Sequence, residues 1–241
     1  MAITTYADLI PYMLPDLPGY QAGTALAALR AAGREFCRRS EAWTDDLDPV
    51  DLVIGQRDFS LTPVIAGTTY SAAVKRIVLV RMHFGDVDDY AAATDYVTGQ
   101  VVRDAAGVGK FYFCTDDHTS TGSAIAADLT ANPGSWRDYD GYPLDEDDWE
   151  FVRPATLRLS ANRIPSIAID TGLTVKAVLV PDQDANDMPS WVLGRYSEAI
   201  IGYALHQLLR RRDPDRALYW LGQYNKAVNQ AFVDGAKEIG V

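Results

Sequence analysis

Helical periodicity near both ends of the chain, with β-strand texture between them, constrains the fold more than any other feature. Residues 21–42 carry apolar or small side chains at steps of three and four, beside a stripe of arginines. The same periodicity returns over 190–211 and again over 214–238. This order of elements predicts an α+β fold. We expect the N- and C-terminal helices to pack as a helical bundle beside an antiparallel, β-rich middle.

Two helix starts are marked in the sequence. Asp213 followed by Pro214 supplies an N-cap and a first-turn proline for the last helix. Near the N-terminus, a threonine N-cap with Asp8 in the first turn predicts a short helix. Pro15 and the Pro18–Gly19 pair end that helix.

The middle of the chain predicts a series of short strands joined by turns. After Trp43, turn residues at Asp48–Pro49 and Gly55–Gln56 accompany two short strands. Asp170–Gly172 predicts a hairpin turn between two later strands. The further strands are expected over 74–82, 96–103, 110–115, 154–160, 166–170 and 173–180.

The alternation of helical and strand patterns predicts that the chain is divided into four parts. They are the N-terminal helices (1–45), a β-rich middle domain (46–85 and 142–182), an inserted surface module (86–141), and a C-terminal helical hairpin (183–241) that packs on the N-terminal helices. Such an insertion is tolerated because the entropy of closing a loop grows slowly with its length.

Charge is distributed unevenly over the 241 residues, whose net charge is −11. Residues 86–151 hold three basic and fifteen acidic side chains, whereas 190–241 hold seven basic and five acidic ones. A surface that coats nucleic acid needs an excess of Lys and Arg, so this composition argues against one. The sequence shows no signal peptide and no apolar run long enough for a membrane span, so we expect synthesis in the cytoplasm.

One stretch, FYFCTDDHTS at 111–120, gathers side chains that catalyse reactions or bind metals. A cysteine nucleophile needs a base and an orienting group, but no oxyanion loop or flanking signature surrounds Cys114 and His118. A zinc site needs about four ligands, and no paired cysteine motif is present. We therefore expect no catalytic residue, no metal and no cofactor. Cys114 should be a free, buried thiol, as should Cys37, and the Asp and His side chains should face water.

Of two further clusters, only the C-terminal one favours protein contacts. The run Asp145–Glu150 after Pro143 is typical of a solvated helix start. The C-terminal hairpin is rich in aromatic and basic side chains, most of them expected in the core and some at a large protein interface. The candidate interface residues are Trp191, Tyr196, Tyr203, Arg210, Arg211, Arg212, Tyr219, Trp220 and Tyr224.

Two segments resemble the head-to-tail adaptor proteins of tailed bacteriophages. The first runs from Arg34 to Pro49, closing a helix and opening a β region. The second runs from Lys176 to Pro181 and continues from Met188 to Ile200 into the closing helical hairpin. The resemblance covers about 1–85 and 142–241.

This resemblance implies a virion structural protein at the head–tail junction. Copies of the chain, typically twelve, would form a ring beneath the portal protein, extend the DNA channel and dock the next tail or nozzle component. Genomic DNA would pass through the ring without sequence-specific binding, and no membrane would be involved. Another tail ring, such as a terminator or the nozzle base, is the alternative among structural proteins.

The inserted module resembles a small β module of phage tail and decoration proteins, akin to the carbohydrate-binding modules of chitinases. The similarity runs from Lys110 through Ala127–Leu129 to Trp136. It implies a glycan-binding decoration module, with Tyr112, Trp136 and Tyr139 as candidates for stacking on a sugar. Burial of these rings in a small core is the competing interpretation.

Overall fold

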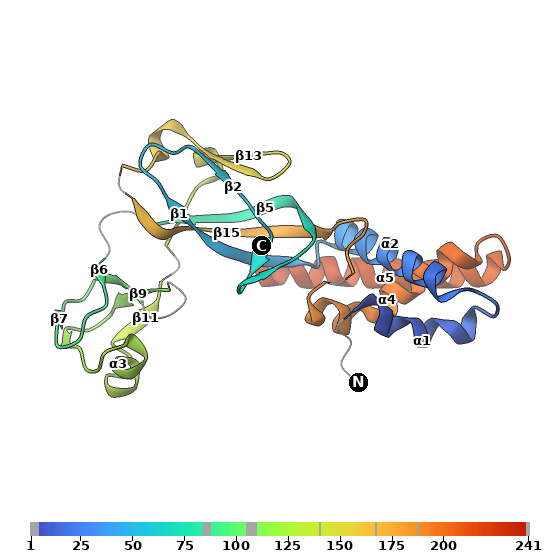
Figure 1. The fold of residues 1–241 in the computed structure, drawn as a ribbon, viewed down its shortest axis with the longest axis horizontal. Helices are drawn as coiled ribbons and strands as arrows, with labels where there is room; N and C mark the ends of the chain where they lie inside the picture. The colour runs from blue at the N-terminus through green and yellow to red at the C-terminus, as the bar shows by residue number, and fades with distance from the viewer. Residues whose placement is uncertain are drawn as a thin grey trace. The chain divides into compact units, whose positions relative to one another are not determined.

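The chain folds into two compact units, which we describe separately (Figure 1). The computed structural model describes residues 5–83, 88–104, 110–139, 141–166, 168–186 and 188–239, the last five in their backbone only. Unit 1 comprises residues 1–47, 61–78 and 176–241, and unit 2 comprises 48–60 and 79–175. Helices and antiparallel sheets confirm the α+β class. The ends of the predicted insertion, at 86–87 and 140, lie outside the described residues.

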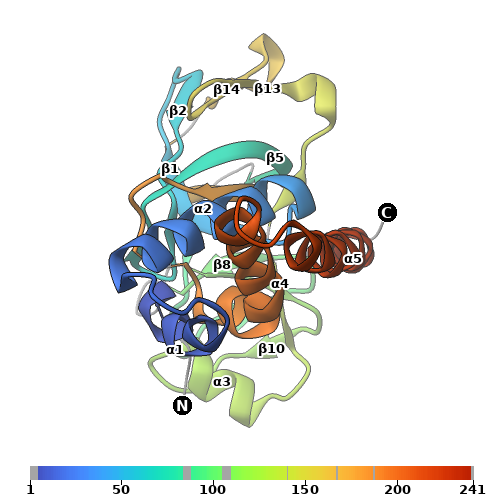
Figure 2. The same cartoon turned by 90° about the vertical axis from the view of Figure 1, so that its right-hand side faces the viewer.

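Unit 1 is built mainly from helices (Figure 2). Helix α4 packs against both α2 and α5, and α2 also contacts α5. The last helix begins as its sequence predicts, because Asp213 Oδ1 accepts the N–H of Arg216 at 3.1 Å and Pro214 occupies the first turn. The helices and 3-10 turns of unit 1 are η1 (Tyr6–Leu9), α1 (Ile10–Met13), η2 (Leu14–Asp16), α2 (Ala22–Ser40), α4 (Ser190–Leu209) and α5 (Pro214–Ile239).

An aromatic cluster fills the space between these helices. Phe36 of α2 packs against Tyr196 of α4 with ring centroids 4.9 Å apart, and against Tyr224 of α5 at 6.2 Å. Tyr203 of α4 contacts Tyr224 at 4.4 Å. Phe36 and Tyr224 are completely buried, so each helix places an aromatic ring in one shared core.

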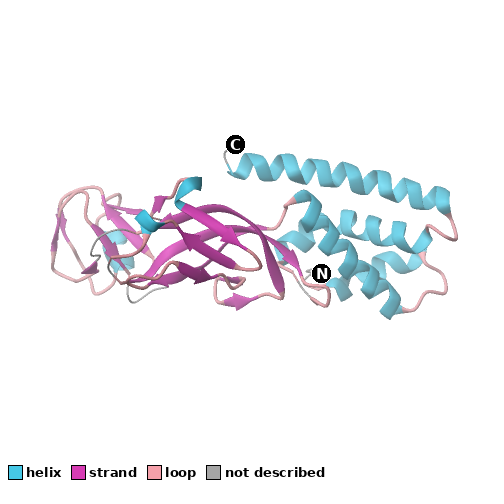
Figure 3. Ribbon diagram, turned by 90° about the horizontal axis from the view of Figure 1, so that it is seen from above, coloured by secondary structure: helices cyan, strands magenta, loops and turns pink. Residues whose placement is uncertain are grey.

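The strands form several small sheets, drawn as arrows in Figure 3. The sheet orders are β1-β15-β5-β12, β13-β14-β2, β11-β9-β8-β6, β10-β7 and β3-β4. The long strands are β1 (Thr44–Leu52), β5 (Ala72–Met82) and β15 (Ile169–Pro181). The shorter ones are β2 (Asp58–Ser60), β3 (Val64–Ile65), β4 (Thr68–Thr69), β6 (Asp88–Asp89), β7 (Asp95–Tyr96), β8 (Val101–Arg103), β9 (Phe111–Cys114), β10 (His118–Thr119), β11 (Trp136–Asp138), β12 (Tyr142–Pro143), β13 (Trp149–Val152) and β14 (Thr156–Leu159). Helix α3 (Ile125–Ala131) and the 3-10 turns η3 (Glu146–Asp148) and η4 (Ala161–Arg163) complete unit 2.

Two predicted turns are wrong because strands run through them. Asp48–Pro49 lies inside β1, and the strand that follows the next turn, β2, belongs to a different sheet. Asp170–Gly172 lies inside β15, where Thr171 adopts a left-handed φ of 55°. Asp51 accepts the N–H of Thr171 at 2.7 Å, so a side chain bonds the backbone where the strand is distorted.

The close approach of η1 to α2 yields a test of packing. Gly33 lies in the interior of α2, and a Cβ added there would meet ring carbons of the buried Tyr6 at 2.7 and 2.8 Å. We expect Gly33→Ala to destabilise unit 1 by about 1–3 kcal/mol, although alanine is the better helix former. Gly222→Ala in α5, where a Cβ meets nothing within 4 Å, should stabilise it by about 0.5–1 kcal/mol. Urea unfolding followed by the helical circular dichroism signal measures both, and equal effects would contradict the packing.

Candidate functional site

The chemistry-bearing residues of 111–120 lie in a small β module between β6 and β11 of unit 2. Strand β9 pairs antiparallel with β11, which sets Cys114 opposite Trp136, and β10 pairs with β7, which sets His118 opposite Tyr96. Helix α3 follows β10 and precedes β11. The apolar core of the module is small and consists of Tyr96, Val102, Cys114, Ile125 and Trp136.

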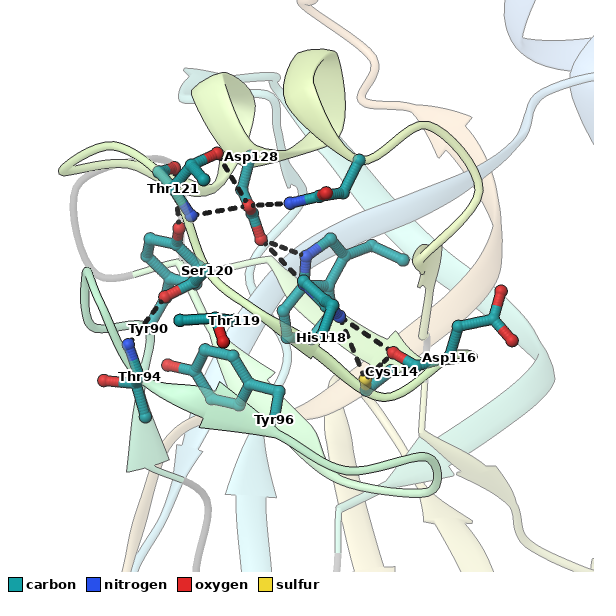
Figure 4. A network of polar contacts seen from close by, with 12 residues as sticks. Tyr90, Thr94, Tyr96, Cys114, Asp116, His118, Thr119, Ser120, Thr121 and Asp128 are labelled. Carbon is teal, nitrogen blue, oxygen red and sulfur yellow. Dashed lines mark hydrogen bonds and ion pairs between the residues drawn. The ribbon is translucent and has the colours of Figure 1, made fainter.

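The carboxylate of Asp128 is the centre of the polar contacts in this module (Figure 4). Its side chain is 0% exposed. Oδ2 accepts a hydrogen bond from Trp136 Nε1 at 2.7 Å and lies 3.0 Å from His118 Nε2. Oδ1 accepts bonds from Thr121 N at 2.8 Å and Oγ1 at 3.1 Å, and from Asn132 Nδ2 at 2.8 Å. Five donors therefore surround one buried carboxylate, which satisfies its hydrogen-bonding capacity.

These bonds keep Asp128 ionised. Burial alone would raise the pKa of this carboxyl, because it disfavours the charged form. The hydrogen bonds from Trp136, Thr121, His118 and Asn132 outweigh burial and lower the pKa to about 2. The module thus holds a negative charge inside a small core.

The surroundings of His118 favour the matching positive charge. Its Nδ1 lies 2.8 Å from the carbonyl oxygen of Asp116, and its Nε2 faces the carboxylate of Asp128. Both oxygens can only accept, so both ring nitrogens must carry protons. Although burial disfavours the imidazolium, these two bonds raise the pKa of His118 above its usual value. With 10% of its side chain exposed, His118 does not face water, and that part of the sequence prediction is wrong.

Cys114, His118 and Asp128 lie in a row, but the row does not activate the thiol. The distance from Cys114 Sγ to His118 Nδ1 is 3.8 Å, and that nitrogen already donates to the Asp116 carbonyl. The thiol bonds the same carbonyl at 3.2 Å. Burial raises the pKa of Cys114, so the thiol stays protonated at neutral pH. An imidazolium cannot take a proton from it, and the geometry supplies no general base.

The predictions for the two thiols and for the aspartates of this stretch are confirmed. Cys114 and Cys37 are both free and buried, and the carboxylates of Asp116 and Asp117 are exposed. In the part of the chain that the structure describes, no group of three or more His, Cys, Asp or Glu side chains is arranged to hold a metal ion.

The three candidate sugar-stacking rings lie in different environments. Trp136 is 5% exposed, its ring edge-on to Tyr96 at 5.0 Å, so its indole offers no open face. Tyr112 is half-buried and packs against the module core. Tyr139 is half-buried beside His83, with ring centroids 5.3 Å apart. None of the three rings is exposed as a platform on which a sugar could stack.

The candidate interface residues of α4 and α5 divide into exposed and buried sets. Tyr224 is buried, whereas Tyr196, Tyr203 and Trp220 are half-buried. The three tyrosines all belong to the aromatic cluster. The exposed members, which remain available for a partner, are Trp191, Arg210, Arg211, Arg212 and Tyr219. Arg212 also lies over the ring of Tyr20, 4.8 Å from its centroid. Leu218, Phe232 and Val233 are exposed apolar residues of α5 that the sequence prediction did not include.

Comparisons with known proteins identify no relative. No protein-family model matches the chain, and no curated protein matches it. Among the described residues, no helix has both the length and the apolar character that crossing a membrane requires.

The five bonds to Asp128 predict a strong and local effect of its substitution. Asp128→Asn would remove the charge that faces His118 and would point an amide N–H group at other hydrogen-bond donors. We therefore expect residues 111–138 to lose about 3 kcal/mol of stability against local opening. Hydrogen exchange followed by mass spectrometry measures this for each segment. Asp116→Asn, on an exposed carboxylate of the same stretch, is the matched control and should change protection little. Equal protection in both variants would contradict a central role for Asp128.

The two shifted pKa values predict a pH window. Asp128, whose pKa is lowered, contributes stability that is present above its unfolded pKa of about 4 and is lost as the pH falls through about 2. His118, whose pKa is raised, contributes stability that is present below its unfolded pKa of about 6.5 and is lost as the pH rises through the folded pKa. Protection factors for 111–138 should therefore be highest between about pH 4 and 6.5. His118→Gln should flatten the decline above that window, and an unchanged decline would exclude His118 as its cause.

Proposed function

We propose that the chain is a virion structural protein, a phage head-to-tail adaptor that forms a ring beneath the portal. In this role it extends the DNA channel and docks the next tail or nozzle component. Its partners are the portal protein, copies of itself, twelve by resemblance, and that tail component. Genomic DNA passes through the lumen without sequence-specific binding. The protein acts by assembly at the head–tail junction of the virion, not by turnover of a substrate.

The observation that carries this proposal is an exposed apolar face on α5. Leu218, Tyr219, Phe232 and Val233 are between 48% and 63% exposed. Leu218 lies fourteen residues before Phe232, and Tyr219 lies fourteen residues before Val233. This spacing puts the Leu218–Tyr219 pair and the Phe232–Val233 pair on one side of the helix, roughly 21 Å apart. Two exposed pairs of large apolar side chains on one side of α5 offer a protein partner two apolar patches to cover.

Two further observations support an assembly role. The thiol of Cys114 lies beside His118, but its raised pKa keeps it protonated. Among the described residues, no general base is positioned to convert it to a nucleophilic thiolate. The net charge of −11 gives DNA phosphates little to bind, as a channel that releases a genome requires.

Another tail ring, a terminator or the nozzle base, would expose a similar face, and the position of the chain in the particle separates these roles. A glycan-binding decoration module fits less well, because the indole of Trp136 is buried. A glycan array probed with the full chain tests that alternative, and a flat response would remove it.

The apolar face of α5 predicts which substitutions block assembly. Leu218→Glu and Phe232→Glu would place charges in the interface, so we expect both variants to be lost from purified particles and from complexes with the portal protein of the same genome. Both side chains are exposed, so unfolding should change by no more than about 0.5 kcal/mol. Gln223→Glu, an exposed position elsewhere on α5, is the control and should assemble normally.

Cryo-electron microscopy of the particles locates the chain directly. Closed rings between portal and tail are the expected result. Absence of the chain from purified particles, with the protein found only as a free monomer in infected cells, would overturn the proposal.

A further inference from the structure

A groove in unit 1 is lined by arginines. Arg30, Arg34 and Arg38 follow one another at steps of four residues on α2, so their side chains project from one side of the helix. They line a groove of about 560 Å³, with Gln183 and Asp184 contributing to its lining. All of these residues belong to unit 1.

The arginines of this groove are only partly neutralised. Glu35 pairs with Arg38 at 2.8 Å, and Arg30 bonds the side-chain oxygen of Asn186. The Nε of Arg30 is buried and finds no acceptor among the described residues. Arg34 is exposed and has no ion pair or hydrogen bond in the described part of the chain. Three arginines against the carboxylates of Glu35 and Asp184 leave the lining one positive charge in excess, and the exposed guanidinium of Arg34 is open to an acidic acceptor.

The acidic excess of the chain lies entirely in the other unit. Unit 2 holds 8 Lys and Arg and 19 Asp and Glu, a net charge of −11, whereas unit 1 holds 14 of each. Within unit 1 the arginine groove is therefore a local positive site on a neutral body. Within unit 2, acidic groups have few cations to pair with.

One acidic turn of unit 2 is well placed to be presented to a partner. Asp145, Glu146 and Asp147 at η3 are all exposed, and none has a side-chain hydrogen bond or ion pair among the described residues. The turn is fixed at both sides, since Leu144 is buried and Asp148 pairs with Arg163 at 2.9 Å. Three carboxylates held on an anchored turn lose little entropy when they bind.

We propose that the groove formed by Arg30, Arg34 and Arg38 binds the Asp145–Asp147 turn of a second copy of this chain. The contact is head-to-tail, because one copy offers the groove and the next offers the turn, and such contacts close into rings when the rotation between copies allows it. Opposite charges on the two surfaces guide the encounter and fix the register between copies. The inference rests on the proposed function, since it supplies the subunit contact that the ring requires.

A charge-swap experiment on the full chain tests this contact. Arg34→Glu, and separately the triple variant Asp145→Arg, Glu146→Arg and Asp147→Arg, should each weaken self-association in analytical ultracentrifugation by about tenfold or more. A mixture of the two variants should restore association, because every groove then meets a turn of opposite charge. Association of the native chain should also weaken as salt is raised. Lys110→Glu and Asp116→Arg, at exposed charges elsewhere, are controls that should associate as the native chain does.

Carbodiimide coupling gives an independent readout. In Arg34→Lys the new amine should couple to a carboxylate of 145–147, and mixing isotope-labelled with unlabelled chains shows whether the bond joins two copies. Coupling of this amine to 145–147 of its own chain would overturn the proposal. So would native association of Arg34→Glu, failure of the mixture to recover, or a native chain that stays monomeric at all salt concentrations. Loss of binding to a short DNA duplex in Arg34→Glu, without loss of self-association, would assign the groove to phosphate and would also overturn it.

The outcomes separate this inference from the adaptor proposal. If the chain is missing from particles while the mixed variants recover association, the adaptor proposal fails and the contact stands. If the chain forms rings in particles while Arg34→Glu assembles normally, the contact fails and the adaptor proposal stands.

Discussion

The buried carboxylate of Asp128 is the interaction on which the module between β6 and β11 depends. Five buried residues form the apolar core of that module, too few to position its short strands by packing alone. Asp128 bonds groups from β10, β11, the connection before α3 and the end of α3, so a single side chain joins all of these segments. A buried carboxylate whose hydrogen bonds are all made specifies one arrangement of the segments around it. The loss of any of these bonding partners would leave the charge of Asp128 less well compensated in the core. The same bonds that stabilise the module occupy both ring nitrogens of His118, so neither nitrogen is free to accept a proton from the Cys114 thiol.

Unit 1 is stabilised by packing and not by a buried carboxylate, because its longer helices bury enough apolar surface to form a core. Phe36, Tyr196 and Tyr224 meet at the centre of three helices, and Gly33 leaves the space in which Tyr6 lies against α2. With its own core satisfied, α5 still exposes Leu218 and Phe232 on its outer side. Those side chains add nothing to the fold of one copy, which is why we assign them to an interface.

The sequence predicted the features that depend on neighbouring residues, and missed those that depend on distant segments meeting in the fold. The limits of α2 and the Asp213 cap of α5 follow from periodicity and capping rules, and the structure confirms them. The turn predicted at Asp170–Gly172 failed because the same residue types also occur at a distortion inside a long strand. Asp128 was missed because a lone acid after two alanines is typical of a solvated helix start, and nothing in its neighbours shows that four other residues fold onto it. Aromatic content marked α4 and α5 correctly as unusual, but it could not distinguish the buried Tyr224 from the exposed Tyr219.

The partition of charge between the units limits how copies of the chain can associate. Two surfaces of unit 2 brought together would place acidic groups side by side, and this repulsion grows with every copy added to a ring. This repulsion favours contacts between copies that include unit 1, which is neutral as a whole. Unit 1 offers two such surfaces, the apolar face of α5 and the arginine groove of α2. The first suits a partner of any charge, whereas the second favours an acidic one. A ring that joined its copies through the groove, as we propose, would leave the α5 face free for the proposed portal contact.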